Sequence, residues 1–149
     1  MDLPAARTLA TSLMAQHGVD WDFKWDRAKK RAGRTNFTSR TVSLSGHLTK
    51  LCTEEQVRQT VLHEIAHVLV GPGHGHGPVW QKKAREIGAD PKRSTGPDFP
   101  KAPAPWQATC PAGHAHYRYR KPTRPVSCGL CSRTFSERHL LTWRKVTTQ

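Results

Sequence analysis

Hydrophobic and polar positions alternate with a period that changes along the first third of the chain. Residues 3–16 place apolar side chains at helical spacing among good helix formers and are predicted to form an amphipathic helix. The alternation over 21–25 indicates a strand. Residues 31–37 and 40–45 lie on either side of a polar turn, an arrangement typical of a β-hairpin.

Two further helices are predicted in the middle of the chain. Thr53 is followed three residues later by Gln56, the capping-box arrangement, and the apolar run after it predicts a helix to about Val70. Pro78 suits the first turn of another helix, which is expected to end near Ile87. Helices mixed with a short run of strands indicate an α+β fold.

A change of composition divides the chain into three parts. Residues 91–105 contain five prolines and no sustained periodicity, which indicates a partly extended linker. The residues beyond it contain short β-type segments, clustered cysteine and histidine, and few aliphatic side chains. We therefore expect a core at 1–90, a linker at 91–105 and a small subdomain at 106–149.

The charge of the chain is strongly positive, with 24 Lys and Arg against 11 Asp and Glu among 149 residues, a net +13. The excess lies in the flanks: residues 1–52 hold nine basic and four acidic groups, 106–149 hold eight and one, and 53–105 hold seven and six. Such a balance favours polyanionic partners, nucleic acid first. No apolar run could span a bilayer and no signal-peptide pattern is present. We expect a cytosolic monomer, associated with the nucleoid in a bacterium or nuclear in a eukaryote.

The predicted helix that starts after Thr53 carries a candidate metal site. His63 and His67 lie one turn apart on the same helix face, so both imidazoles can reach one ion. Glu64 lies about 100° round from His63, too far for a third ligand but near enough to face a metal-bound water. The surrounding helix is otherwise apolar, and a glutamate there is expensive to bury without a partner. These residues therefore predict a hydrolytic metal site.

A catalytic zinc needs three protein ligands and one open position, so a third ligand must lie beyond the helix. His76 stands just before the next predicted helix, after glycines that let the chain turn back. His74 is the alternative. The metzincin frame, His-x-x-Gly-x-x-His after the second ligand, is disfavoured because Gly71 and His74 each come one residue late.

A second, structural metal site is predicted in the last part of the chain. Cys128 and Cys131 have the spacing of a zinc knuckle, and Cys110 with His114 would complete a closed Cys3His tetrahedron. His116 remains the alternative fourth ligand. A subdomain with so few aliphatic residues cannot form a large apolar core, so it needs a bound metal ion or a similar cross-link to be stable. The remaining cysteine, Cys52, is interpreted as a buried core thiol.

These motifs resemble those of the SprT-like (Spartan) metalloprotease family over roughly residues 5–145. The resemblance rests on His63-Glu64-x-x-His67, a glycine-containing loop, and His76-Gly77-Pro78-x-Trp80 at the head of the next helix. It implies a zincin-like α+β core, with helices and a small antiparallel sheet, followed by a small zinc-binding β subdomain. It also implies DNA-dependent proteolysis of proteins bound or cross-linked to DNA. The family usually has two Cys-x-x-Cys knuckles, so the Cys-x-x-x-His half is a departure.

In the expected mechanism, zinc on the three histidines activates a water and polarises the scissile carbonyl. Glu64 takes the proton and passes it to the leaving amine. The expected cofactors are thus two Zn2+ ions, one catalytic and one structural.

Basic residues interleaved with aromatic rings predict a surface for DNA, because rings can stack on unpaired bases while cations follow the phosphates. No base-reading motif is visible, so single-stranded or distorted DNA without sequence preference is expected. The candidate residues are Lys29, Lys30, Arg31, Arg34, Trp106, Tyr117, Arg118, Tyr119, Arg120, Lys121 and Arg124.

Three functions are compatible with these motifs. The first is a DNA-dependent endopeptidase acting on DNA-bound proteins, including copies of itself. The second is a general zinc peptidase whose basic surface selects acidic substrates. The third is a non-catalytic zinc-ribbon nucleic-acid binder, which Glu64 disfavours because a structural zinc site gains nothing from an unliganded carboxylate.

Overall fold

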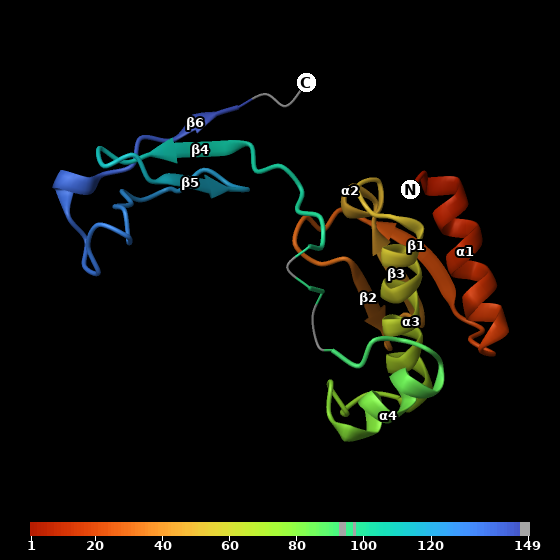
Figure 1. Ribbon diagram of the computed structural model, residues 1–149. Coiled ribbons are helices and arrows are strands. Elements are labelled where there is room, and N and C mark those ends of the chain that lie inside the picture. The colour runs from red at the N-terminus through yellow and green to blue at the C-terminus, as the bar shows by residue number, and fades with distance from the viewer. Residues whose placement is uncertain (93–94, 97, 147–149) are drawn as a thin grey trace. The chain divides into compact units, whose positions relative to one another are not determined.

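The computed structural model describes residues 1–92, 95–96 and 98–146. The chain divides into two compact units, Met1–Ala102 and Pro103–Gln149, and this boundary falls inside the predicted linker. Figure 1 traces the elements of both units. No helix in the described ranges is long and apolar enough to cross a lipid bilayer.

The first unit contains four α-helices and three strands in its described part. Helix α3 packs against α1, α4, β2 and β3 and so forms the centre of the unit (Figure 1). The elements are α1 (Leu3–Gln16), β1 (Asp22–Asp26), β2 (Gly33–Asn36), β3 (Thr41–Ser45), α2 (Gly46–Thr49), α3 (Glu54–Val70) and α4 (Pro78–Glu86).

The α+β class is confirmed, but the sheet of the first unit is not purely antiparallel. Its strand order is β1-β3-β2, with β1 parallel and β2 antiparallel to β3. The β2–β3 hairpin leaves one side of β3 free, and β1 pairs there in the same direction as β3. All five residues of β3 are buried, as expected for a central strand, whereas β2 lies at an edge.

Local capping explains the bounds of α3. The Thr53 side chain accepts a hydrogen bond from the Gln56 N–H, and the Gln56 side chain accepts one from the Thr53 N–H, which is a complete capping box. The helix ends at Gly71, whose φ of 83° lies in the region that glycine tolerates best. The helix bounds predicted from Thr53 and Val70 are therefore confirmed.

The core of the first unit forms between α3, the sheet and the two flanking helices. Its largest fully buried side chains include Leu44 on β3, Val57, Val61 and Ile65 on α3, and Trp80 on α4. Cys52 is buried in this core as a free thiol.

The second unit is a small antiparallel sheet with little apolar core. Its described strands are β4 (Trp106–Thr109), β5 (Ala115–Arg118) and β6 (Arg144–Lys145), in the order β5-β4-β6. A single 3-10 turn, η1 (Glu137–His139), follows the knuckle. The buried cluster consists of Ala108, Cys110, Cys128 and Leu141.

Candidate metal centre and catalytic cleft

The three candidate histidines of the first unit converge on one point. His63 and His67 project from α3, and the loop after α3 returns His76 opposite them. His76 Nε2 lies 3.0 Å from His63 Nε2 and 3.1 Å from His67 Nε2. Gly71, Gly73 and Gly75 all adopt positive φ in this loop, which is how the chain reverses within so few residues.

These distances fit a metal ion. Three nitrogens at zinc bond lengths in a tetrahedral arrangement lie roughly 3.4 Å apart, close to the separations in the structure. Burial, followed by the neighbouring imidazoles, lowers the pKa of His63 and His67 to about 4. Both rings are therefore neutral at pH 7 and can donate their lone pairs to a cation.

Trp80 forms a platform under all three imidazoles. Its ring centroid lies 4.7 Å from those of His63 and His76 and 5.2 Å from that of His67, and the residue is fully buried. Gln81, the next residue of α4, donates a hydrogen bond to the main-chain oxygen of His76 at 3.0 Å. Sequence reasoning missed Trp80 as a site residue, although the aromatic position after His76-Gly77-Pro78 was the available signal.

Glu64 is buried beside strand β2. The Thr35 hydroxyl on β2 donates a hydrogen bond to Glu64 Oε2 at 2.7 Å. Burial raises the pKa of Glu64 to about 7, against the smaller lowering effects of the Thr35 hydrogen bond and the Arg31 charge. A carboxylate with such a pKa can take and release a proton near neutral pH.

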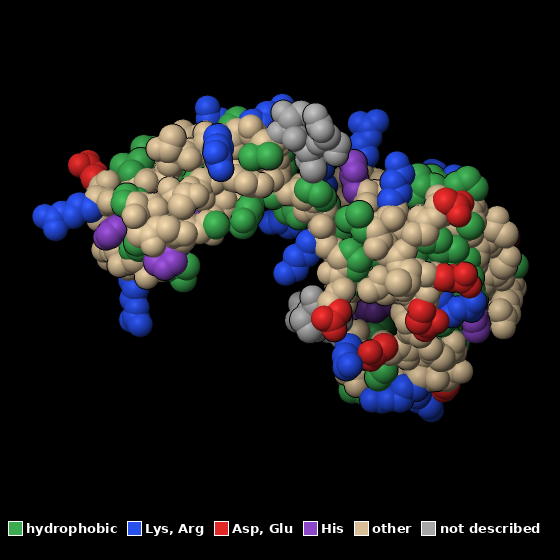
Figure 2. Space-filling view, turned by 45° about the horizontal axis from the view of Figure 1, so that its top comes forward, with side chains coloured by type: hydrophobic (Ala, Val, Ile, Leu, Met, Phe, Trp, Pro, Cys, Tyr) green, Lys and Arg blue, Asp and Glu red, His purple; other side chains and the backbone are tan. Residues whose placement is uncertain are grey.

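An open cleft of about 660 Å³ gives access to these residues. Its described lining comes from β2 with the loop before it, from α3, from His76, and from six residues after α4: Asp90, Lys92, Thr95, Gly96, Asp98 and Phe99. Charged side chains of both signs line the cleft. Besides Glu64, they are the cations Lys30, Arg31, Arg34 and Lys92 and the anions Glu55, Asp90 and Asp98. Figure 2 shows acidic side chains gathered on this unit around a recess in which histidine is visible.

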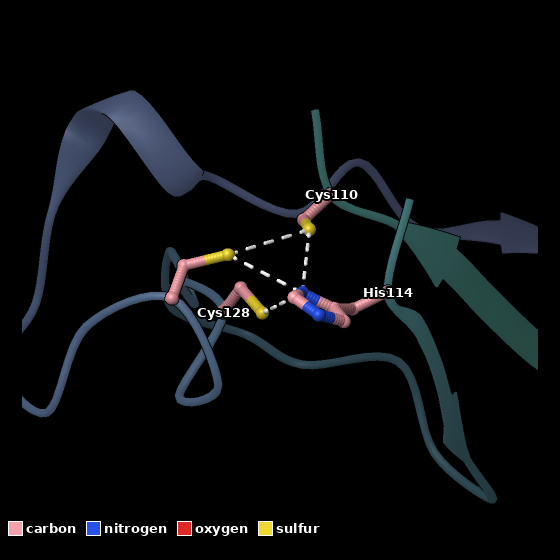
Figure 3. Close-up of side chains that lie close together, drawn as sticks. Cys110, His114 and Cys128 are labelled. Atoms are coloured by element: carbon pink, nitrogen blue, oxygen red, sulfur yellow. Dashed lines mark hydrogen bonds between the residues drawn. The ribbon is translucent and has the colours of Figure 1, made fainter. Parts of the chain in front are cut away.

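The second unit brings together Cys110, His114, Cys128 and Cys131. Figure 3 shows the three labelled side chains, Cys110, His114 and Cys128, pointing toward one centre from different segments. His114 Nδ1 lies 3.5 Å from Cys110 Sγ, 3.7 Å from Cys128 Sγ and 3.3 Å from Cys131 Sγ, and the sulfurs of Cys110 and Cys131 are 3.7 Å apart.

These separations also match a tetrahedral zinc site, in which sulfur–nitrogen and sulfur–sulfur distances are roughly 3.6 and 3.8 Å. Burial would raise the pKa of Cys110, but main-chain hydrogen bonds from His114 and Ala112 help to lower it to about 6. The alternative ligand, His116, lies outside the group of four. Its Nε2 instead approaches Cys128 Sγ at 3.1 Å, as an outer hydrogen-bonding partner.

The candidate DNA-binding residues fall in both units. Lys29, Lys30, Arg31 and Arg34 belong to the first, where Arg31 pairs with Asp26 at 3.0 Å. The remaining candidates, Trp106, Tyr117, Arg118, Tyr119, Arg120, Lys121 and Arg124, belong to the second.

In the second unit, cations lie over aromatic rings. Lys121 Nζ is 5.4 Å from the Trp106 ring centroid, and the Arg118 guanidinium is 5.8 Å from that of Trp143, a residue that sequence reasoning did not select. The unit has one acidic residue, Glu137, against eight basic ones, and the face in Figure 2 is correspondingly rich in Lys and Arg.

Three convergent imidazoles and a buried glutamate in one open cleft define a zinc peptidase. The model of the SprT-like family matches residues 6–102, and the chain belongs to this family. No curated protein matches the chain significantly. Among solved structures, it is similar to the metallopeptidase zymogen of Methanocaldococcus jannaschii jannalysin, with 16% identity and a TM-score of 0.48, over 54% of this chain and 79% of that one.

Proposed function

We propose that this protein is a DNA-dependent zinc endopeptidase that cleaves proteins bound or cross-linked to DNA, copies of itself included. His63, His67 and His76 would hold a catalytic zinc ion. Cys110, His114, Cys128 and Cys131 would hold a structural one. The observation that carries the proposal is the placement of Glu64 next to three convergent imidazoles at an open cleft.

The chain's own residues supply the acid–base chemistry. A zinc ion, when bound, makes water more acidic and polarises a carbonyl group. The Glu64 carboxylate takes the proton of the attacking water and delivers it to the leaving amine. Burial keeps His63 and His67 neutral for this role, and the Trp80 ring packs against all three imidazoles.

A substrate chain can be bound in extended form along β2. This strand is at the edge of its sheet and lines the cleft beside Glu64 from Gly33 to Thr35. Main-chain groups on the free side of an edge strand can pair with an added peptide strand without regard to its side chains. Such recognition suits a protease that meets many different DNA-bound proteins.

The DNA requirement is supported by the positive charge of the second unit. Eight basic residues against one acidic residue, with cations over the half-buried rings of Trp106 and Trp143, suit the backbone and unpaired bases of single-stranded or distorted DNA. This binding should be independent of sequence and should weaken steeply as salt rises. The protein would act as a monomer at the nucleoid or in the nucleus.

The test is cleavage of a DNA-binding protein by the full chain, with and without single-stranded DNA. We expect DNA to raise the rate strongly at low salt. The Glu64→Gln variant should retain its zinc but cleave at least about a thousandfold more slowly, since the general base is lost. Cleavage by Glu64→Gln at the wild-type rate would refute the assignment of Glu64.

A general zinc peptidase is the second candidate, because Lys30, Arg31 and Arg34 line the cleft itself and would favour acidic peptides. The same assay separates the two functions. Equal rates with and without DNA, together with preferential cleavage of acidic peptides, would favour the general peptidase.

A further inference from the structure

Strand β2 faces Glu64 with two alternate residues, Gly33 and Thr35. In a strand, residues two apart lie on the same side, so both are directed toward α3. The Thr35 hydroxyl is 2.7 Å from Glu64 Oε2 and 3.1 Å from the main-chain oxygen of Glu64. Thr35 and Glu64 are 29 positions apart, so the contact depends on the packing of the sheet on α3.

Gly33 leaves the space that the glutamate side chain occupies. A Cβ atom at this position would lie 2.9 Å from both Cγ and Oε1 of Glu64 and 3.0 Å from Cγ2 of Thr60. Real Cβ atoms essentially never approach other atoms below 3.0 Å. The backbone of β2 is therefore in close contact with the side chain of Glu64 along its length.

We propose that Thr35 is a positioning residue for the Glu64 carboxylate. Its hydroxyl holds Oε2 against β2 and thereby fixes the plane of the carboxylate in the cleft. The proposal rests on the proposed function, in which Glu64 is the general base.

A hydroxyl suits this role because it is a neutral donor whose hydrogen bond either an ionised or a protonated carboxyl group can accept. While Glu64 is ionised, Thr35 donates to Oε2. When the other oxygen, Oε1, takes the proton from water, Oε2 becomes the carbonyl oxygen of the carboxyl group and still accepts the hydrogen bond from Thr35. The carboxyl group can thus stay in place until the proton leaves for the amine.

The experiment compares Thr35→Val, which is nearly isosteric but has no hydroxyl, with Thr35→Ser, which restores it. Thr38→Val is the matched control, because Thr38 is exposed in the turn of the same hairpin and does not line the cleft. For each variant, kcat and KM for a protein substrate, zinc content and Tm are measured. Crystal structures of the wild type and Thr35→Val, both purified with their zinc, give the position of the Glu64 carboxylate.

We expect Thr35→Val to lower kcat roughly ten- to a hundredfold, the usual effect of removing a partner that orients a catalytic group, while KM and zinc content stay the same. Thr35→Ser should restore kcat to within about threefold, and Thr38→Val should match the wild type. In the Thr35→Val structure the carboxylate should have rotated away from β2. If Thr35→Val does not fold, Thr35→Ala provides the same comparison.

Equal kcat for Thr35→Val and the wild type would overturn the proposal, as would failure of Thr35→Ser to recover activity. A different result, no proteolysis by the wild type under any condition, would count against the proposed function. The crystal structures then decide the role of Thr35 separately, because an unmoved Glu64 carboxylate in Thr35→Val would overturn it.

Discussion

The protonation states of His63, His67 and Glu64 make the cleft suitable for a cation. His63 and His67 are neutral at pH 7 because burial disfavours the imidazolium form. Glu64 is buried in the same cleft with a pKa raised to about 7. A divalent ion therefore enters a site whose two helix ligands, His63 and His67, need not lose protons first, which favours tight binding near neutral pH.

Replacing His76 should remove the catalytic zinc. His76→Ala deletes the nitrogen that lies 3.0 and 3.1 Å from the other two ligands, and two protein ligands rarely retain zinc. We expect zinc content to fall by about one equivalent per chain, with loss of proteolysis, as measured by elemental analysis of the purified protein. His74→Ala is the matched control, since His74 is exposed in the same loop. Loss of zinc from His74→Ala but not from His76→Ala would reverse the assignment.

Gly33→Ala tests the close contact between β2 and Glu64. The added methyl group would displace the glutamate side chain or the strand, because its Cβ would lie 2.9 Å from Cγ and Oε1 of Glu64. We expect kcat to fall at least about tenfold, with zinc content unchanged. Gly46→Ala is the control, since its Cβ would meet only an oxygen at 3.8 Å. Full activity in Gly33→Ala would show that the contact is easily relieved.

Sequence periodicity identified the groups of the site that share one helix, but not those contributed by other elements. A helical repeat fixes the angle between His63, Glu64 and His67, so their relation can be predicted from spacing alone. The roles of Thr35 and Trp80 depend on how β2 and α4 pack on α3. No local pattern encodes that packing.

Among the elements, the strand pair β1–β3 depends most clearly on a single side chain. The Asp26 carboxylate at the end of β1 accepts hydrogen bonds from Ser43 on β3, from Arg31 before β2, and from the Ala28 N–H. Burial would raise the pKa of Asp26, but these hydrogen bonds and the Arg31 charge lower it overall. The Asp26 carboxylate therefore connects strand β1 to strand β3 and to the loop before β2, which leads to the cleft.

Asp26→Asn should destabilise the protein at neutral pH and remove part of its acid sensitivity. A lowered folded-state pKa means that Asp26 stabilises the fold above about pH 4 and that this contribution disappears as pH falls through the folded pKa. We expect Asp26→Asn to lower the free energy of unfolding by roughly 1 kcal/mol at pH 7 and by less at about pH 3. Urea titrations at the two pH values measure this. Asp20→Asn is the control, and a constant difference between the two pH values would contradict the interpretation.

The starts of helices α3 and α4 could be predicted because residues next to them in the sequence mark where each helix begins. Thr53 with Gln56 sets the start of α3, and Pro78 sets that of α4, because capping involves neighbours in sequence. The direction of β1 was not predictable, since pairing with β3 is a contact between distant residues. The short helix α2, capped by Ser45, was also missed, because four residues show no periodicity.

At the scale of the whole molecule, the two units differ in what stabilises them. The first has an apolar core built from three helices and a sheet. Among the described residues of the second, only Ala108, Leu141 and two cysteines are buried apolar residues, while Leu130 and Phe135 are 73% and 58% exposed. A core this small does not offset the entropy of ordering the chain, so we expect a metal bound at the four-residue site to supply much of the stability of the second unit.

Removing zinc should therefore unfold the second unit and leave the first folded. We expect a strong chelator, or Cys128→Ser, to abolish amide-exchange protection over residues 106–145 while protection in α1 and α3 persists. The same treatment should abolish the proposed binding to single-stranded DNA, because the paired cations and rings of the second unit, Arg118 with Trp143 and Lys121 with Trp106, would lose their arrangement. His76→Ala provides the control, since it empties the catalytic site alone and should leave both exchange protection and DNA affinity of the second unit intact. Persistent protection of β4 and β5 after complete zinc removal would show that the sheet is stable without its metal and that the four ligands serve another purpose.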